Sequence, residues 1–249
     1  MKLAAIYNVF DGAELLVPSM SRIRGHVDMI IIVWQNISNF GEHYDPRGHI
    51  NFNDFEEVIP VFYEPDLQFG GGYNERTKRN LGISVARAHG ATHFLHMDCD
   101  EFYEDFGKAK QMFETSGAAG SVCKMHTYFK HPTLRLENPD NYHVPFIHKM
   151  RDDTIAGFVP YPFYCDPTRA INETDVIEIS AMMHHFSWCR KDFGLKARNS
   201  TARKNIAKTT LLQDVMDPAV KDGTYLPHYS QMLIRVPDLF GLSPIFEQK

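Results

Sequence analysis

The run at residues 28–35 constrains the fold most, because six consecutive hydrophobic residues from Met29 to Trp34 form its centre. A continuous apolar run of this length is typical of a strand that is covered on both faces, as in a parallel sheet. Shorter runs at 3–10 and 92–97 predict two further strands, and residues 74–89 predict an amphipathic helix that stops at Gly90. The alternation of strands and helices predicts a doubly wound α/β fold with a mostly parallel sheet.

Two other segments predict strands of a different kind. Residues 57–63 contain Pro60, which removes a ladder hydrogen bond and therefore favours an edge strand or a bulge. Residues 176–183 form a late apolar strand that ends before His184 and His185. Between them, six of the 14 prolines fall at 132–167, so this region is expected to form an irregular, aromatic-rich lobe without long helices.

Composition narrows the class of protein. The length of 249 residues suits one catalytic domain with an appended lobe. The net charge of −5, from 26 basic and 31 acidic residues, argues against a dedicated nucleic-acid binder. The opening residues do not form a signal peptide and no apolar run reaches the length of a membrane span, so we expect a cytoplasmic protein. Four widely spaced cysteines fit neither a zinc knuckle nor a disulfide framework and are expected to be reduced.

An acidic turn follows the predicted strand at 92–97. Asp98 and Asp100 stand at i and i+2, and two carboxylates so placed can face one Mg²⁺ or Mn²⁺ ion. The pair alone is weak evidence for a metal site, since an isolated Asp-x-Asp is more often a solvated turn. Here the helix before it carries Lys78 and Arg79, which would compensate the remaining charge of a diphosphate. His93 and His96 are expected on opposite strand faces, which argues against a hydrolase metal cluster.

With that context, residues 79–102 resemble the core of the GT-A glycosyltransferases, in particular the family 2-like members. The resemblance rests on Arg79-Asn80-Leu81-Gly82 in the helix and on Asp98-Cys99-Asp100-Glu101-Phe102 after the strand. It implies a Rossmann-like sheet flanked by helices, a divalent metal, either Mn²⁺ or Mg²⁺, and a nucleotide-diphosphate sugar as donor. Asp100 would coordinate the metal, Asp98 would contact the donor's ribose or sugar or the metal, and Glu101 would support the turn.

Residues 7–16 are similar to the first strand, loop and helix of the same superfamily, which hold the base and ribose. The residues expected to contact the donor by this resemblance are Asn8, Asp11, Trp34, Gln35, Lys78, Arg79 and Asn80.

The late strand contributes a further resemblance, to a His-Phe-x-Gly-x-x-Lys pattern of some retaining members. His185 would be a third metal ligand and Lys191 would contact the diphosphate as a catalytic residue. The glycine of the pattern is absent, because Trp188 stands in its place, so Lys196 or Arg198 could substitute for Lys191. Which of His184 and His185 would bind the metal stays open.

The chain thus divides into a nucleotide-sugar-binding half at 1–105, an acceptor-side lobe at 106–175, and a third part at 176–249 with the metal histidine and a basic segment. We expect a metal-dependent hexosyl- or pentosyltransferase. The acceptor is open between a glycan, a small molecule and a modified nucleic-acid base that the basic segment at 190–208 would face. Stereochemistry and oligomeric state are also open, as is the general base, for which the candidates are Asp152, Asp153, Asp166, Glu173 and Asp175.

Two other functions remain as alternatives. A metal-dependent nucleotidyltransferase or phosphohydrolase would also use clustered carboxylates and basic residues. A non-catalytic nucleotide-sugar-binding protein would bind the donor without turnover.

Overall fold

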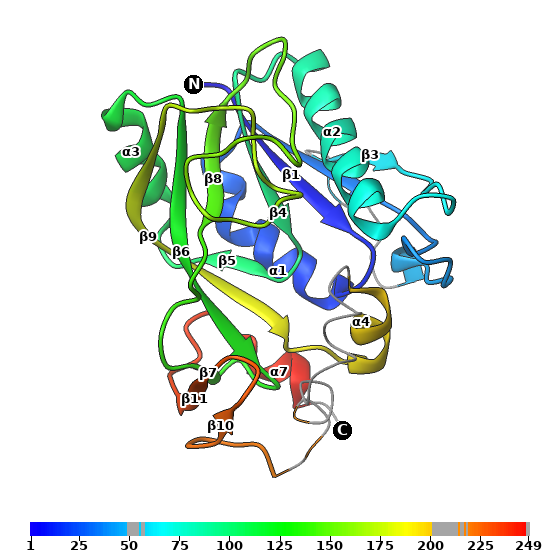
Figure 1. Ribbon diagram of the computed structural model, residues 1–249, viewed down its shortest axis with the longest axis vertical. Coiled ribbons are helices and arrows are strands. Elements are labelled where there is room, and N and C mark those ends of the chain that lie inside the picture. The colour runs from blue at the N-terminus through cyan, green and yellow to red at the C-terminus, as the bar shows by residue number, and fades with distance from the viewer. Residues whose placement is uncertain (49–54, 56–57, 201–213, 215–216, 218, 248–249) are drawn as a thin grey trace.

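The structure is a computed structural model that describes residues 1–48, 55, 58–200, 214, 217 and 219–247. It has a mixed α/β architecture around one sheet with the strand order β10-β11-β7-β6-β8-β4-β1-β2-β3, in which β9 pairs with β6 and β5 pairs with β9 (Figure 1). The strands are β1 (Leu3–Val9), β2 (Met29–Trp34), β3 (Val58–Phe62), β4 (His93–Asp98), β5 (Glu101–Tyr103), β6 (Gly120–Phe129), β7 (Leu134–Leu136), β8 (Val144–Lys149), β9 (Val176–Trp188), β10 (Tyr225–Leu226) and β11 (Gln231–Arg235). The helices are α1 (Ala13–Ile23), α2 (Gly71–Ala88), α3 (Phe106–Ser116), α4 (Phe193–Asn199) and α7 (Ser243–Phe246), with short 3₁₀ turns η1 (Arg24–His26) and η2 (Pro46–Gly48).

The parallel part of the sheet is formed by β3, β2, β1 and β4, as the apolar runs predict. In this register Asn8 lies beside Val33 on one side and Asp98 on the other, so the carboxyl ends of β1, β2 and β4 coincide. Among the strands of the described residues, β3 is the last at this end of the sheet, and its Pro60 lies opposite Ile32. The expected edge position of the proline-containing strand is therefore confirmed.

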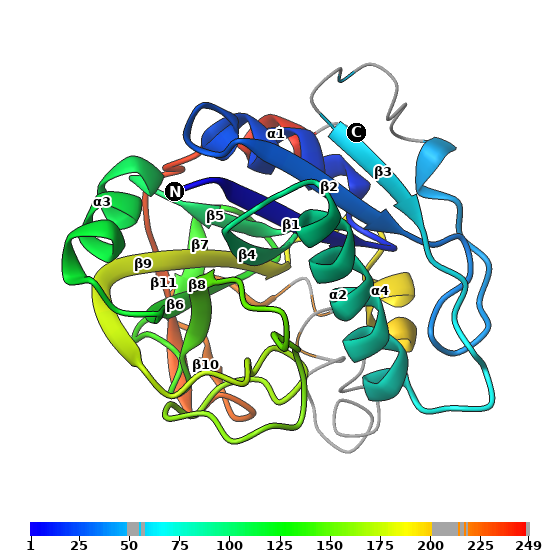
Figure 2. The same ribbon diagram turned by 90° about the horizontal axis from the view of Figure 1, so that it is seen from above.

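Helices cover both faces of the parallel strands. Ala5 and Tyr7 of β1 pack with residues of α1 and α3, whereas Ala4 and Ile6 pack with residues of α2. Figure 2 shows α1 and α2 on opposite sides of the sheet. Helix α2 approaches β1 closely at Gly82, where a Cβ atom would lie 2.3 Å from Cγ2 of Ile6.

The acceptor-side lobe predicted at 106–175 is irregular over only part of its length. Strands β6 and β8 continue the central sheet, with β8 antiparallel to both β4 and β6. Pro145 of β8 lies opposite Val122 next to a shift in register, which is where a sheet tolerates proline. Residues 150–175 have the expected irregular chain and carry isolated bridges such as Ala156 to Ile171.

Strand β9 is longer than predicted and continues to Trp188. It pairs parallel with β6 along its whole length, from Val176 to Trp188, and residues 183–185 also pair antiparallel with β5. His184 and His185 therefore lie inside the strand, opposite Phe102 and Glu101. Among the residues that the structure describes, no helix is long and apolar enough to span a membrane.

Candidate functional site

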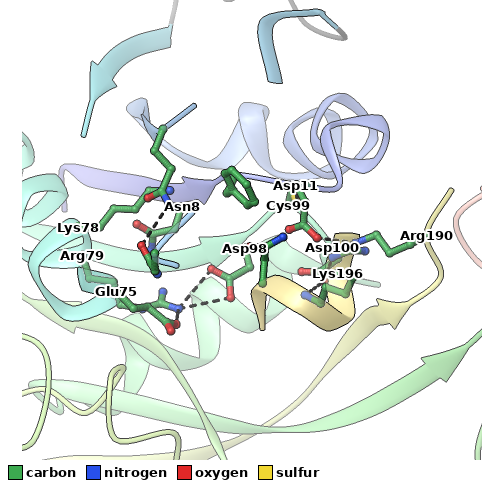
Figure 3. A pocket seen from close by; sticks show the side chains of 14 residues that line it. Asn8, Asp11, Glu75, Lys78, Arg79, Asp98, Cys99, Asp100, Arg190 and Lys196 are labelled. Carbon is green, nitrogen blue, oxygen red and sulfur yellow. Dashed lines mark hydrogen bonds and ion pairs between the residues drawn. The ribbon is translucent and has the colours of Figure 1, made fainter. Parts of the chain in front are cut away.

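A pocket lies where β1, β2 and β4 end, and α2 and α4 close it at two sides (Figure 3). Its empty volume is about 600 Å³, a figure that includes the open mouth. The residues from the sequence prediction that line it are Asn8, Asp11, Gln35, Lys78, Arg79, Asp98 and Asp100. Residues that are far apart in the sequence, between positions 8 and 100, thus meet at the carboxyl ends of the parallel strands, as expected for a doubly wound fold.

Asp98 and Arg79 form an ion pair on one side of the pocket. The Nη2 atom of Arg79 lies 3.3 Å from Oδ1 of Asp98 and 2.9 Å from Oε1 of Glu75, one helical turn earlier. Burial alone would raise the pKa of Asp98, but the guanidinium groups of Arg79 and Arg169 hold it below its ordinary value. Asp98 is therefore an anion whose carboxylate stays partly accessible from the pocket, with its side chain 32% exposed.

Asp100 lies in a second charged cluster, which is separated from Arg79 by Asp98 in Figure 3. Arg190 donates a hydrogen bond from Nη2 to Oδ2 of Asp100, and the same oxygen lies 3.6 Å from Nζ of Lys196 and 3.5 Å from Nε2 of His185. Burial alone would raise the pKa of Asp100, but these cations and the imidazole hold it well below its ordinary value. Asp100 is a fully buried carboxylate neutralised by fixed side chains.

Glu101 supports the turn between these two aspartates, as predicted. Its Oε2 atom accepts a hydrogen bond of 3.0 Å from the backbone N–H of Asp98. Arg169, from the irregular segment, donates to both carboxylate oxygens of Glu101 and to the backbone carbonyl of His96. A buried ion pair therefore fixes the backbone that delivers both aspartates to the pocket.

Several polar atoms around the pocket have no hydrogen-bond partner within the described residues. They include both amide atoms of Asn8, Oε1 of Gln35, and Nε and Nη1 of Arg79. Buried polar groups are nearly always hydrogen-bonded, because an unpaired group costs about 1–3 kcal/mol. The unpaired donors and acceptors around this pocket indicate that it takes a polar ligand or water.

Lys78 adds a cation with unusual acidity. Its side chain is buried, and Nζ donates a hydrogen bond of 2.7 Å to the backbone carbonyl of Val9. Burial lowers the pKa of Lys78 to about 7, although Asp98 opposes the shift. Near neutral pH the ammonium and the amine are both populated.

This shift makes a prediction for stability against pH. The folded pKa of about 7 lies below the ordinary value of 10.5, so between these values the unfolded chain binds more protons and stability rises with pH. Relative to Lys78→Met, the free energy of unfolding of the wild type is expected to increase by about 2 kcal/mol from pH 7 to pH 9. Urea titrations of both proteins at each pH measure it, and a constant difference would contradict the low pKa.

Four residues of the sequence prediction lie outside the lining of the pocket. Trp34 packs against the ring of Phe62, and the Asn80 amide makes two hydrogen bonds with the backbone of Ala156. His185 is near Asp100 but does not line the pocket, and Lys191 is exposed, with its backbone N–H bonded to Glu14.

The two histidines of β9 differ in their surroundings. His184 is buried against Tyr128, whose hydroxyl lies 2.8 Å from Nδ1, so of the two only His185 approaches Asp100. His93 and His96 are hydrogen-bonded sheet residues, to Thr92 and to the carbonyl of Arg79, as expected.

The sequence prediction included Arg190 only in the basic segment that could face an acceptor and named Lys196 only as a substitute for Lys191, yet both line the pocket. The chain leaves β9 at Trp188, and Arg190 turns inward where it packs 3.0 Å from the position of a Cβ atom on Gly12. Lys196 projects from α4, whose N-terminus is capped by the side chain of Asp192. Lining residues to which the sequence prediction gave no role are Phe10, Asn39, Glu75, Cys99 and Asn199. The part of the basic segment at 201–208 lies outside the described residues.

Cys99 lies between the two aspartates and packs inward. Its thiol contacts the backbone carbonyl of Asp11 at 3.1 Å, and burial raises its pKa well above the ordinary value. All four cysteines are free and buried, which agrees with the expected reduced thiols.

The residues around Asp100 do not fit a divalent metal ion. The oxygen that would bind the metal already faces Arg190 and Lys196, and a divalent cation beside them would be repelled by two fixed positive charges. The carboxylate of Asp98 faces the guanidinium group of Arg79 and does not face the carboxylate of Asp100, as it would if the two shared one metal ion. Within the described part of the chain, no group of three or more His, Cys, Asp or Glu side chains is arranged to hold a metal ion.

No family model and no curated protein sequence matches the chain. Among solved structures, residues 1–349 of S. aureus TarS are similar with a TM-score of 0.46 and 11% identity, over 75% of this chain and 61% of that one. S. aureus TarS 1–349 in complex with UDP-GlcNAc matches with a TM-score of 0.38 and 14% identity, over 51% and 35%. A mannose-1-phosphate geranyltransferase from Thermus thermophilus matches with a TM-score of 0.34 and 16% identity, over 61% and 51%. The chain thus spans about three fifths of the length of the first of these structures.

Proposed function

We propose that this protein transfers a glycosyl group from a nucleoside-diphosphate sugar to an acceptor. The observation that carries the proposal is the pocket at the ends of β1, β2 and β4. In this pocket, amide atoms without a hydrogen-bond partner among the described residues lie beside carboxylates that form ion pairs with arginine and lysine side chains. The unpaired amide group of Asn8 and the unpaired Oε1 atom of Gln35 suit a nucleoside, which offers several hydrogen-bond donors and acceptors. The cations Arg79 and Lys196 suit the diphosphate, and the partly exposed Asp98 suits the hydroxyl groups of a ribose or sugar.

In such a transfer the bond between the anomeric carbon and the diphosphate oxygen breaks, and its electron pair leaves on the diphosphate. An oxygen of the acceptor forms the new bond to the anomeric carbon and gives up its proton. Fixed cations that face the departing diphosphate stabilise the charge that develops there, without rearrangement during the reaction. Arg79 and Lys196 are placed for this role in the proposal.

A donor screen tests the proposal. Thermal unfolding is measured with a panel of nucleoside-diphosphate sugars that includes UDP-GlcNAc, with and without Mn²⁺. A donor at 100 times its Kd should stabilise the protein by about 2.7 kcal/mol and raise the melting temperature by several degrees. The nucleosides and free sugars serve as controls and should have much smaller effects. A panel with no stabilising member would contradict the proposal.

Mass spectrometry of the products then separates the alternatives. A glycosyltransferase, given an acceptor, yields a nucleoside diphosphate and a glycosylated product. A nucleotidyltransferase or phosphohydrolase instead cleaves a phosphate bond of the donor. A protein that binds a donor without turnover with any acceptor would be a binding protein.

A further inference from the structure

We propose that Arg190 and Lys196 take the place of a divalent cation at Asp100, so that the diphosphate of the donor is bound by Lys196 without any metal ion. The proposal rests on the proposed function, because it names what holds the diphosphate in the same pocket. It also reassigns Asp100, which the sequence predicts to be a metal ligand, as the anchor of two cations.

Arg190 is fixed as the permanent counter-charge of Asp100. It is 3% exposed, and Nη1 donates to the backbone carbonyls of Phe186 and Cys189 at 3.0 and 3.2 Å. Nη2 donates to Asp100, and Nε lies 3.8 Å from Oδ2 of Asp11. These contacts hold Nη1 and Nη2, and only Nε has no hydrogen-bond partner among the described residues, so the role of the guanidinium group is chiefly to neutralise and position.

Lys196 has the opposite character. Its ammonium group forms an ion pair with Asp100 at 3.6 Å and makes no hydrogen bond to any residue that the structure describes. The side chain is 20% exposed and lines the pocket. An ammonium group has three N–H donors, so Lys196 keeps its donors for an anion while Asp100 holds it in place.

The arrangement separates two tasks that one metal ion would otherwise combine. Arg190 balances the charge of the buried Asp100, and Lys196 presents positive charge to the ligand. Arg79 has two unpaired nitrogen atoms on the far side of Asp98, which lies between the two basic groups in Figure 3. A diphosphate that reaches across Asp98 would therefore meet a cation at each end of the pocket.

The first experiment uses the wild-type protein. Its affinity for UDP, GDP, ADP, CDP and dTDP is measured by titration calorimetry in EDTA and in Mn²⁺. For the nucleoside diphosphate that binds most tightly, the Kd measured in EDTA is expected to agree within about twofold with the Kd measured in Mn²⁺. Binding that is at least about tenfold weaker in EDTA would overturn the inference and leave the proposed function standing. Absence of binding in both conditions would overturn the proposed function, and this inference with it.

The second experiment compares two lysine variants. Lys196→Met removes the charge-assisted contact and should weaken binding of the same nucleoside diphosphate by about 10- to 100-fold, with little effect on its nucleoside. Lys149→Met is the matched control, because Lys149 is exposed and lies opposite His93, at the other end of β4 from Asp98. Its affinity should equal that of the wild type. Equal affinity in Lys196→Met would overturn the inference.

Discussion

Replacing Glu101 by glutamine is expected to lower the free energy of unfolding by about 3–5 kcal/mol. Glu101 is fully buried, and its carboxylate is the partner of Arg169, which is 6% exposed. The glutamine side chain has the same shape but no charge, so the Arg169 guanidinium would stay buried without its hydrogen-bonded counter-ion, and of the described carboxylates only that of Asp98 nearby would offset its charge. Urea denaturation followed by circular dichroism measures the change.

Asp45→Asn is the control for that experiment, because it also removes a carboxylate from an ion pair with arginine. The pair of Asp45 and Arg47 is on the surface, where water screens the interaction, and no measurable change in stability is expected. Equal effects of the two variants would show that Glu101 and Arg169 are not the buried support of the acidic turn.

Replacing Asn8 by leucine is expected to weaken donor binding by at least about tenfold while stability stays the same or rises. The amide atoms of Asn8 have no hydrogen-bond partner within the described residues, so the unliganded protein loses no bond. A bound nucleotide would lose the partners that the amide offers. Titration calorimetry with the donor and urea denaturation measure the two effects.

Asn80→Leu should give the reverse result. Both amide atoms of Asn80 bond to the backbone of Ala156, at 2.9 and 2.8 Å, and Asn80 does not line the pocket. We expect a loss of about 1–3 kcal/mol in stability and an unchanged donor affinity. Reduced affinity in Asn80→Leu without loss of stability would restore the role that the sequence resemblance assigns to it.

The sequence predicted the parallel strands and α2 well because each is defined by its own local pattern. Continuous apolar runs and one amphipathic stretch are sufficient for β1, β2, β4 and α2. The extension of the sheet by β6 and β8 could not be predicted in the same way. Pro145 argues against a strand inside a sheet unless the nearby shift in register is known. That shift depends on how β8 pairs with β6, which the local sequence of β8 does not indicate.

The pocket was predictable where its residues lie in the predicted helix or follow closely on a predicted strand. Asn8, Gln35 and Asp98 follow from the ends of predicted strands. Arg190 does not, because its direction depends on how far β9 continues and on the space beside Gly12. The sequence pattern therefore favoured Lys191, which the structure leaves exposed.

The contribution of Arg190 and α4 to the pocket also sets an order of events during synthesis. The chain emerges from the ribosome with its N-terminus first, so residues 8–100 of the pocket are made well before Arg190 and Lys196. Until then the carboxylate of Asp100 has no cationic partner from α4 or the end of β9. The nascent sheet must therefore either leave Asp100 hydrated or keep it protonated, and the pocket becomes complete only after residue 199 has emerged.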